Sequence, residues 1–172
     1  MRTTSNLGFE LIRKFESLHD GNLSKIGLQP KLCPRGIVTV GYGHALRRPR
    51  TNEWLTDIND VAKYYPQFAD MTIEDAEDLL QTDVRIFEKI VNSKVQRVIP
   101  QFQFDALVSH TFNTGGSLNL FTFVQNCYPE NVIQNWWLEH YIASNGKTLP
   151  GLIRRRKSEY ELYSTGKLNF FE

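Results

Sequence analysis

Two short segments near the N-terminus carry side chains suited to acid–base chemistry. Glu16 follows apolar residues at helical spacing, and residues 33–44 read C-P-R-G-I-V-T-V-G-Y-G-H. A carboxyl group can donate a proton to a leaving oxygen, and a thiolate can act as a base or a nucleophile. A glutamate at a helix end is most often only a surface charge, so Glu16 needs support from its neighbours before it is interpreted as catalytic.

Cys33 has two interpretations. A thiol is mostly protonated at neutral pH, so Cys33 needs a positive neighbour to react, and Arg35 or His44 would supply one. Alternatively, Cys33 is only a small apolar side chain packed in the interior. Cys127 lies far away in the sequence, and we therefore expect two free thiols, with a disulfide between them as the less favoured alternative.

The composition limits the class of protein. A chain of 172 residues with 41% hydrophobic and 23% charged residues has the size and balance of one globular domain. We expect no secretory signal and no membrane-spanning segment, because no apolar run is long enough. The four histidines are too far apart to form a metal-binding motif, so no metal or other cofactor is expected. Basic residues are in excess in residues 1–50, and acidic residues in 51–92, which permits contact between the basic segment and an anionic polymer.

The elements that must position these side chains follow from periodicity and capping residues. A first helix begins after Ser5 and ends near Glu16 to His19, and a small β-hairpin lobe follows, with residues 37–40 as a strand entering the turn at residues 41–43. Thr72 caps a long helix, and everything after that helix is expected to be helical. Further helices are expected after Asp57, Pro100, Pro129 and Pro150 and over residues 118–126, with Gly166 ending the last one.

These elements predict an α+β fold with a small N-terminal lobe of one helix and a β-hairpin, a long connecting helix, and a C-terminal helical bundle. We expect a single domain over residues 1–172, with lobes at about 1–70 and 71–172.

The order of these motifs resembles the phage-type lysozymes, the endolysin muramidases of glycoside hydrolase family 24. The resemblance includes F-E at residues 15–16, T-V-G-Y-G-H at 39–44 and E-D-A-E-D-L-L-Q-T-D-V at 74–84. It continues through Q-F-D-A-L-V-S-H-T-F-N-T-G at 103–115 and L-P-G-L-I-R-R-R-K-S-E at 149–159. The resemblance implies a lysozyme-like fold for nearly the whole chain.

The resemblance also implies roles for individual residues. Glu16 matches the general acid that protonates the glycosidic oxygen, and Thr39 matches the threonine that holds the attacking water. Without the resemblance, Thr39 would be interpreted as a β-branched residue that only fills a strand. Cys33 stands where similar enzymes usually have an aspartate. That departure leaves open whether Cys33 acts as base or nucleophile or only packs.

Other positions are candidates for contact with the substrate. Tyr42 and Gly43 belong to a glycine-rich turn that lets the backbone approach a sugar ring. His44 is placed beside them, although a structural hydrogen-bonding role is favoured over a catalytic one. Phe112 matches an aromatic residue that lines the sugar cleft, with a core residue as the alternative. Tyr141 is matched only loosely.

The segment between Glu16 and Cys33 is longer than in most similar enzymes, which would enlarge the mouth of the site. Asp20 is the only acidic residue in this segment and is a candidate replacement carboxylate, but a turn at Asp20-Gly21 is favoured. Arg154 to Arg156 are expected to contact the anionic wall, to pair with Glu159, or to form a solvated surface.

The function expected from the resemblance is hydrolysis of the β-1,4 bond between N-acetylmuramic acid and N-acetylglucosamine in peptidoglycan, without a cofactor. Two alternatives are a lytic transglycosylase acting on the same bond and a binding protein that has lost catalysis through the change at Cys33. The expected partner is the peptidoglycan glycan strand, with no nucleic acid and no membrane insertion. We expect a monomer that stays in the host cytoplasm until it is released to the cell wall.

Overall fold

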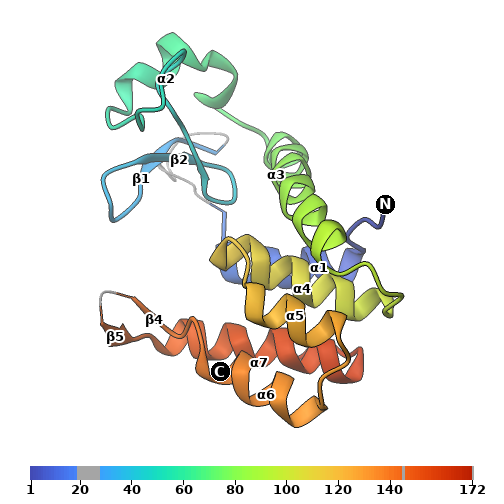
Figure 1. Cartoon of the computed structure of the whole chain (residues 1–172). Coiled ribbons are helices and arrows are strands. Elements are labelled where there is room, and N and C mark those ends of the chain that lie inside the picture. Colours follow the sequence, from blue (N-terminus) through green and yellow to red (C-terminus); the bar gives the residue numbers. More distant parts are fainter. Residues whose placement is uncertain (19–27, 145, 172) are drawn as a thin grey trace. The chain divides into compact units, whose positions relative to one another are not determined.

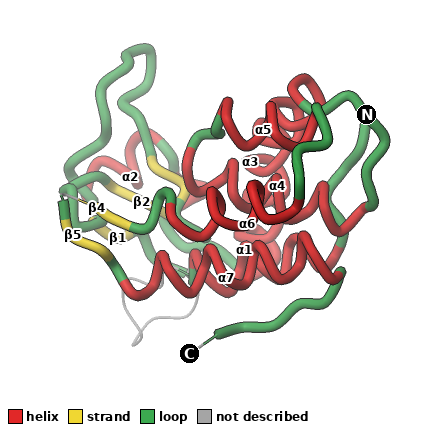
Figure 2. The backbone as a smooth tube through the Cα atoms, turned by 60° about the horizontal axis from the view of Figure 1, so that its bottom comes forward, coloured by secondary structure: helices red, strands yellow, loops and turns green. Residues whose placement is uncertain are grey.

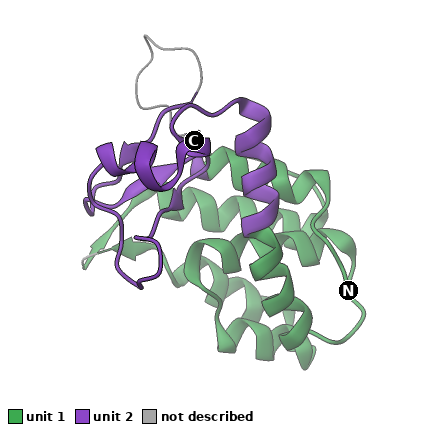
Figure 3. Cartoon of the chain, turned by 90° about the horizontal axis from the view of Figure 1, so that it is seen from above, with its two compact units in different colours: residues 1–15, 84–172 green, residues 16–83 purple. Residues whose placement is uncertain are grey.

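The computed structural model describes residues 1–18, 28–144 and 146–171, and the chain divides into two compact units (Figure 3). Unit 1 contains residues 1–15 and 84–172, and unit 2 contains residues 16–83. These bounds differ from the lobes expected at 1–70 and 71–172, because the first helix packs with the later helices. A Cβ atom added to Gly8 would lie 2.9 Å from the Cβ of Asp105, so the two helices that carry these residues touch closely.

Unit 1 is helical apart from one small hairpin (Figures 1 and 2). It contains most of α1 (Asn6–Glu16), the second half of α3 (Ile73–Lys94), α4 (Gln101–Thr114), α5 (Leu118–Gln125), α6 (Glu130–Glu139) and α7 (Pro150–Thr165). Helix α4 supplies the centre of the core, since every residue from Phe104 to Thr111 is buried. It packs against α7, and α6 packs against α7 as well.

The helix boundaries follow the predicted signals. Pro100 and Pro129 directly precede α4 and α6, and Pro150 is the first residue of α7, where a missing N–H costs nothing. Gly166 ends α7 with a left-handed φ of 72°, and its N–H donates to the Leu162 carbonyl at 3.0 Å. At the start of α3, the Thr72 hydroxyl accepts from the Asp75 N–H at 3.0 Å, while the Asp75 carboxylate accepts from the Thr72 N–H at 2.8 Å. The predicted cap at Thr72 is therefore confirmed.

Unit 2 is built on a three-stranded antiparallel sheet in the order β1 (Lys31–Leu32), β2 (Val38–Val40) and β3 (His44–Ala45). Thr39 pairs with Lys31 on one side and with Ala45 on the other. The short helix α2 (Asn59–Tyr64), the 3-10 helix η1 (Pro66–Phe68) and the first half of α3 complete the unit. Val38 and Val40 are almost fully buried, so β2 is the interior strand of this sheet.

The predicted mixture of helices with a small antiparallel sheet is confirmed, but the expectation that everything after α3 is helical was wrong. Strands β4 (Ala143–Ser144) and β5 (Lys147–Thr148) pair as a two-stranded antiparallel hairpin. The Asn145-Gly146 dipeptide is a strong hairpin signal in the sequence, and Gly146 has a left-handed φ of 74°. Among the described residues, no helix has both the length and the apolar character needed to cross a membrane.

Candidate active site

The β1–β2 turn positions Cys33. Gly36 donates its N–H to the Cys33 carbonyl at 2.8 Å, and Cys33 donates its own N–H to the Ile37 carbonyl at 2.9 Å. Gly36 has a φ of 73°, which a residue with a side chain rarely adopts, and Pro34 supplies the fixed φ that favours a turn. The backbone of Cys33 is therefore held at the end of the hairpin, while its thiol is free and partly exposed.

Thr39 lies on the same hairpin, six residues further on. Its side chain is 5% exposed, and its hydroxyl donates to the Lys31 carbonyl at 3.1 Å. Because Thr39 pairs with Lys31, and Cys33 lies two residues beyond Lys31, the alternation of side chains puts Cys33 and Thr39 on one face of the hairpin. The hydroxyl oxygen keeps acceptor capacity after donating its proton. The arrangement leaves Thr39 able to accept a hydrogen bond from water.

The turn at residues 41–43 is tight and closely packed within unit 2. Gly41 and Gly43 have φ angles of 54° and 86°, so the left-handed region explains both glycines. A Cβ atom on Gly41 would lie 3.5 Å from the Ala76 Cβ. Tyr42 is buried, and its hydroxyl donates to the Glu77 carboxylate at 2.6 Å. Contacts of Tyr42 and Gly43 with substrate stay a prediction.

His44 is joined to α3 by a hydrogen bond to Asp83. Its Nδ1 lies 2.8 Å and 2.9 Å from the two carboxylate oxygens of Asp83, and its ring meets Phe68 edge-on at 6.1 Å. Both contacts lie inside unit 2. This geometry agrees with the structural role favoured for His44 from the sequence, and its contact with substrate stays a prediction.

Glu16 is the last residue of α1 and is half-buried. The helix ends there because Ser17 takes a left-handed φ of 58°. The preceding residue, Phe15, is fixed inside unit 1, where its ring lies 6.2 Å from that of Phe170 and 5.6 Å from the Arg155 guanidinium carbon. The candidate acid therefore follows directly on an anchored side chain. Asp20, the alternative carboxylate, lies outside the described residues.

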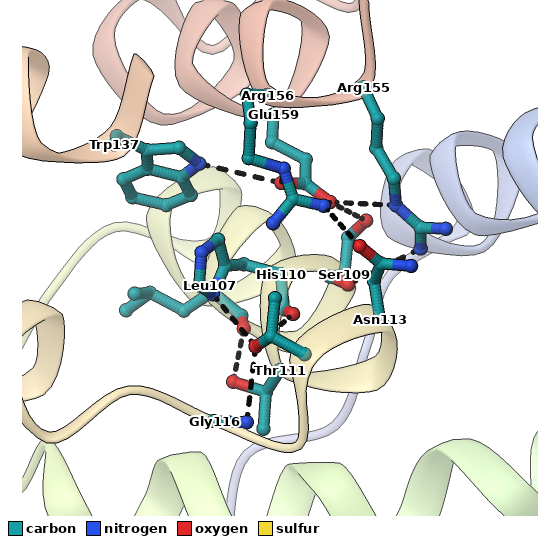
Figure 4. A network of polar contacts seen from close by, with 11 residues as sticks. Leu107, Ser109, His110, Thr111, Asn113, Gly116, Trp137, Arg155, Arg156 and Glu159 are labelled. Carbon is teal, nitrogen blue, oxygen red and sulfur yellow. Dashed lines mark hydrogen bonds and ion pairs between the residues drawn. The ribbon is translucent and has the colours of Figure 1, made fainter. Parts of the chain in front are cut away.

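Unit 1 contains a buried charge network, of which only the pairing of the arginines with Glu159 was predicted from the sequence (Figure 4). Arg155 and Arg156 are 3% and 0% exposed, and their Nε atoms lie 3.0 Å and 3.2 Å from the carboxylate of Glu159, which is also fully buried. The Ser109 hydroxyl donates to the same carboxylate at 2.8 Å. Pairing with Glu159 is confirmed for both arginines, whereas the solvated-surface interpretation holds only for exposed Arg154.

The network sets the protonation of its members. Burial by itself would raise the pKa of Glu159, but Arg156 and Arg155, helped by the Ser109 hydroxyl, hold that pKa below its ordinary value. Burial, with smaller contributions from Arg156 and Arg155, lowers the pKa of neighbouring His110 to about 3 against the opposing pull of Glu159. At neutral pH the network therefore contains a charged carboxylate, two guanidinium groups and a neutral imidazole.

Two other features of unit 1 bear on substrate binding. Phe112 is half-buried, and its ring lies 4.9 Å from that of Phe87, so part of it packs in the helical unit. An open cavity of about 510 Å³ is lined by residues from α5, its preceding loop and the end of α6, namely Gly116, Ser117, Leu118, Asn119, Trp136, His140 and Tyr141. Tyr141 is 44% exposed, and Trp136 stacks on His140 at 4.5 Å, which gives the cavity aromatic walls.

Comparison with known proteins identifies related chains. A family model described as phage lysozyme matches residues 23–159, a segment that includes Cys33, Thr39 and Glu159 but begins after Glu16. An endolysin of Bacillus phage B103 is 30% identical over 166 residues, covering 95% of this chain and 54% of the relative. The chain thus spans about half the length of the Bacillus phage endolysins that it matches.

Solved structures share the fold. The muramidase domain of SpmX from Asticaccaulis excentricus is 28% identical, with a TM-score of 0.67 over 96% of this chain and 99% of that domain. The endolysin from Escherichia coli O157:H7 phage FAHEc1 is 23% identical, with a TM-score of 0.70 over 98% of this chain and 97% of its own. The fold is therefore lysozyme-like along the length of the chain.

Proposed function

Because the chain belongs to the phage lysozyme family, we propose that it hydrolyses the β-1,4 bond between N-acetylmuramic acid and N-acetylglucosamine in peptidoglycan, with Glu16 as general acid. The observation that carries the proposal is the family match over residues 23–159, which contains the complete β1–β2–β3 hairpin region. The 28% identical muramidase domain, matched over almost its whole length, supports the same activity.

In this mechanism three side chains of unit 2, those of Glu16, Thr39 and Cys33, have separate roles. Glu16 gives its proton to the glycosidic oxygen as the bond to the anomeric carbon breaks. Thr39, whose hydroxyl is oriented by the Lys31 carbonyl, accepts a hydrogen bond from the water that attacks that carbon. The water adds hydroxide to the anomeric carbon, and its remaining proton passes to a base. No cofactor takes part in these steps.

Cys33 is the proposed base. It shares a hairpin face with Thr39, and its thiol is free and partly exposed. Water bound at Thr39 would therefore lie on the hairpin face that Thr39 shares with Cys33. A thiolate can accept the water proton in the position where related enzymes usually have an aspartate. Arg35, two residues further along the same turn, is a candidate for the positive charge that favours thiolate.

Substrate contacts complete the proposal. Tyr42, Gly43 and His44 form the rim of the sheet that meets the glycan, and Phe112 offers a ring to a sugar. The aromatic cavity that includes Trp136 and Tyr141 gives unit 1 a second surface on which a sugar ring can stack. The protein is proposed to act as a monomer on the cell wall after its release from the host cytoplasm.

The experiment that tests the reaction is digestion of purified peptidoglycan, with mass spectrometry of the released fragments. Hydrolysis predicts fragments with a free reducing end that carry the added water. A lytic transglycosylase would instead release anhydro-muramic products that are lighter by one water, and a protein that only binds would release none. Either of these results would contradict the proposed reaction.

A further inference from the structure

An arginine-rich hairpin follows β3 directly in unit 2. Residues 47–54, which we call the arginine hairpin, read R-R-P-R-T-N-E-W. Arg47 and Trp54 form an antiparallel bridge, and the Arg48 N–H donates to the Glu53 carbonyl at 2.8 Å. The Thr51 N–H donates to the Arg48 carbonyl at 3.2 Å and closes the tip. The backbone of the hairpin is therefore ordered by its own hydrogen bonds.

The charged groups of the hairpin are available to an anion. The Arg47 guanidinium lies 3.8 Å above the Trp54 ring centroid and donates to the Asn52 carbonyl, so it is fixed in place. Arg48 and Arg50 are exposed, and within the described chain neither guanidinium group hydrogen-bonds or pairs with a carboxylate. Glu53 is the only acidic residue of the hairpin. The local excess of positive charge is thus not neutralised within the hairpin.

The hairpin is continuous with the strand that carries Thr39. The Leu46 N–H donates to the Val38 carbonyl at 2.9 Å, and the Val38 N–H donates to the Leu55 carbonyl at 2.8 Å. Val38 directly precedes Thr39, and Arg48 lies two residues beyond Leu46, roughly 7 Å along an extended chain. The base of the hairpin is therefore joined by backbone hydrogen bonds to the strand of the candidate site.

We propose that the arginine hairpin binds the free carboxylates of the peptide stems attached to the glycan, and so holds the peptide-bearing part of the substrate while the glycan lies at Thr39. The inference rests on the proposed function, because that function supplies a glycan whose repeating units carry such peptides. A guanidinium group presents paired N–H donors in the geometry of a carboxylate, which favours arginine for this task.

The exposed side chains of the hairpin disfavour two other anionic partners. Insertion into a membrane needs exposed apolar side chains, but the only large apolar side chain of the hairpin is Trp54, which is 39% exposed and covered on one face by Arg47. Single-stranded nucleic acid is bound by stacking bases on aromatic rings, and the same contact occupies that face of Trp54. A carboxylate needs only the guanidinium groups.

Sedimentation with insoluble peptidoglycan tests the proposal without requiring catalysis. The variant Arg48→Gln/Arg50→Gln is compared with the wild type and with Lys89→Gln/Lys94→Gln, which removes two exposed positive charges from α3 in unit 1. Each protein is sedimented, after a short incubation on ice that limits digestion, with intact peptidoglycan and with beads that carry glycan strands from which an amidase has removed the peptides. We expect the arginine variant to bind intact peptidoglycan about two- to tenfold more weakly, as for exposed ion pairs, with the difference lost near 1 M salt.

On peptide-free glycan the arginine variant should bind like the wild type, and the lysine variant should match the wild type on both materials. An equal loss on both materials, or an equal loss in the lysine variant, would overturn the proposal. Binding to anionic lipid vesicles or single-stranded DNA that depends on Arg48 and Arg50, without an effect on intact peptidoglycan, would overturn it as well. If the wild type binds but releases no fragments, the proposed function fails while the sedimentation result still decides the role of the hairpin.

Discussion

The Nε atom of Arg156 lies 3.2 Å from the Glu159 carboxylate, and both side chains are completely buried. Two charges removed from water lose their hydration, and only a close pairing offsets that loss. Here Arg155 adds a second ion pair at 3.0 Å, and the Ser109 hydroxyl adds a hydrogen bond. The carboxylate of Glu159 is therefore what allows two arginines to lie inside the helical unit.

Replacement of this carboxylate should destabilise the protein strongly. Glu159→Gln leaves two buried guanidinium groups without their counter-charge, and the free energy of unfolding should fall by about 3–5 kcal/mol. Chemical denaturation monitored by circular dichroism measures the change. Glu139→Gln, at the exposed end of α6, is the matched control and should stay within about 0.5 kcal/mol of the wild type. Equal stability of the two variants would contradict the role assigned to the network.

Buried His110 should make stability depend on pH. Its folded pKa is about 3, well below the ordinary value of 6.5, so the unfolded chain binds a proton in a range where the folded protein does not. The resulting stability is fully present above pH 6.5 and is lost as the pH falls from 6.5 toward 3, by about 1.4 kcal/mol per pH unit.

The comparison that isolates this effect is His110→Phe, which keeps a ring against Trp137 and Tyr141 but cannot titrate. Thermal or chemical unfolding at several values between pH 6.5 and 5 should give a flatter pH dependence for the variant. A variant whose stability declines as steeply as that of the wild type over this interval would show that another group is responsible.

The helix ends illustrate what could be predicted from sequence. Thr72 with Asp75, Pro129 and Gly166 each act through the backbone within a few residues, so their effect does not depend on the rest of the fold. The burial of Arg155 and Arg156 could not be predicted in the same way. Glu159 is close in sequence, but Ser109 and Trp137, which complete the network, come from α4 and α6. From the sequence alone, a run of three arginines is interpreted as a solvated surface, because it does not indicate which residues of other helices contact it.

In the candidate site too, local features could be predicted from the sequence and long-range contacts could not. The strand that carries Thr39 was predicted from the run of β-prone residues at 37–40, which enters the turn at residues 41–43. The pairing of Tyr42 with Glu77 was not predicted, because thirty-five residues separate them and the turn sequence carries no sign of α3. Local geometry was thus accessible from sequence, whereas the hydrogen-bond partners were not.

The thiol of Cys33 should take part in the reaction rather than serve only as a packed side chain. In a Cys127→Ser background, which removes the exposed second thiol, Cys33→Ala or alkylation of Cys33 should lower the rate of peptidoglycan hydrolysis by about 10²-fold or more, as for loss of a general base. Cys33→Asp should keep activity because a carboxylate can accept the same proton. Turbidity clearance at fixed protein concentration measures the rates, and full activity after alkylation would assign Cys33 to packing.

The hydroxyl of Thr39 should matter more for rate than for folding. Thr39→Val keeps the shape of the side chain but removes the hydrogen bond to Lys31, with an expected cost of about 1 kcal/mol in stability. The rate should fall by about 10²-fold because the attacking water loses its positioning partner. Thr39→Ser, which keeps the hydroxyl, should recover most of the rate. If the valine and serine variants were equally active, Thr39 would be no more than a strand residue.

The role of Glu16 is the centre of this account, and one substitution tests it directly. Glu16→Gln has nearly the same size and keeps hydrogen-bonding capacity but has no acidic proton. Digestion of purified peptidoglycan by wild type and variant, with the released fragments weighed and quantified, should give a rate about 10² to 10⁴-fold lower for the variant, while its unfolding transition stays close to that of the wild type. Fragments released by Glu16→Gln at the wild-type rate would contradict the account.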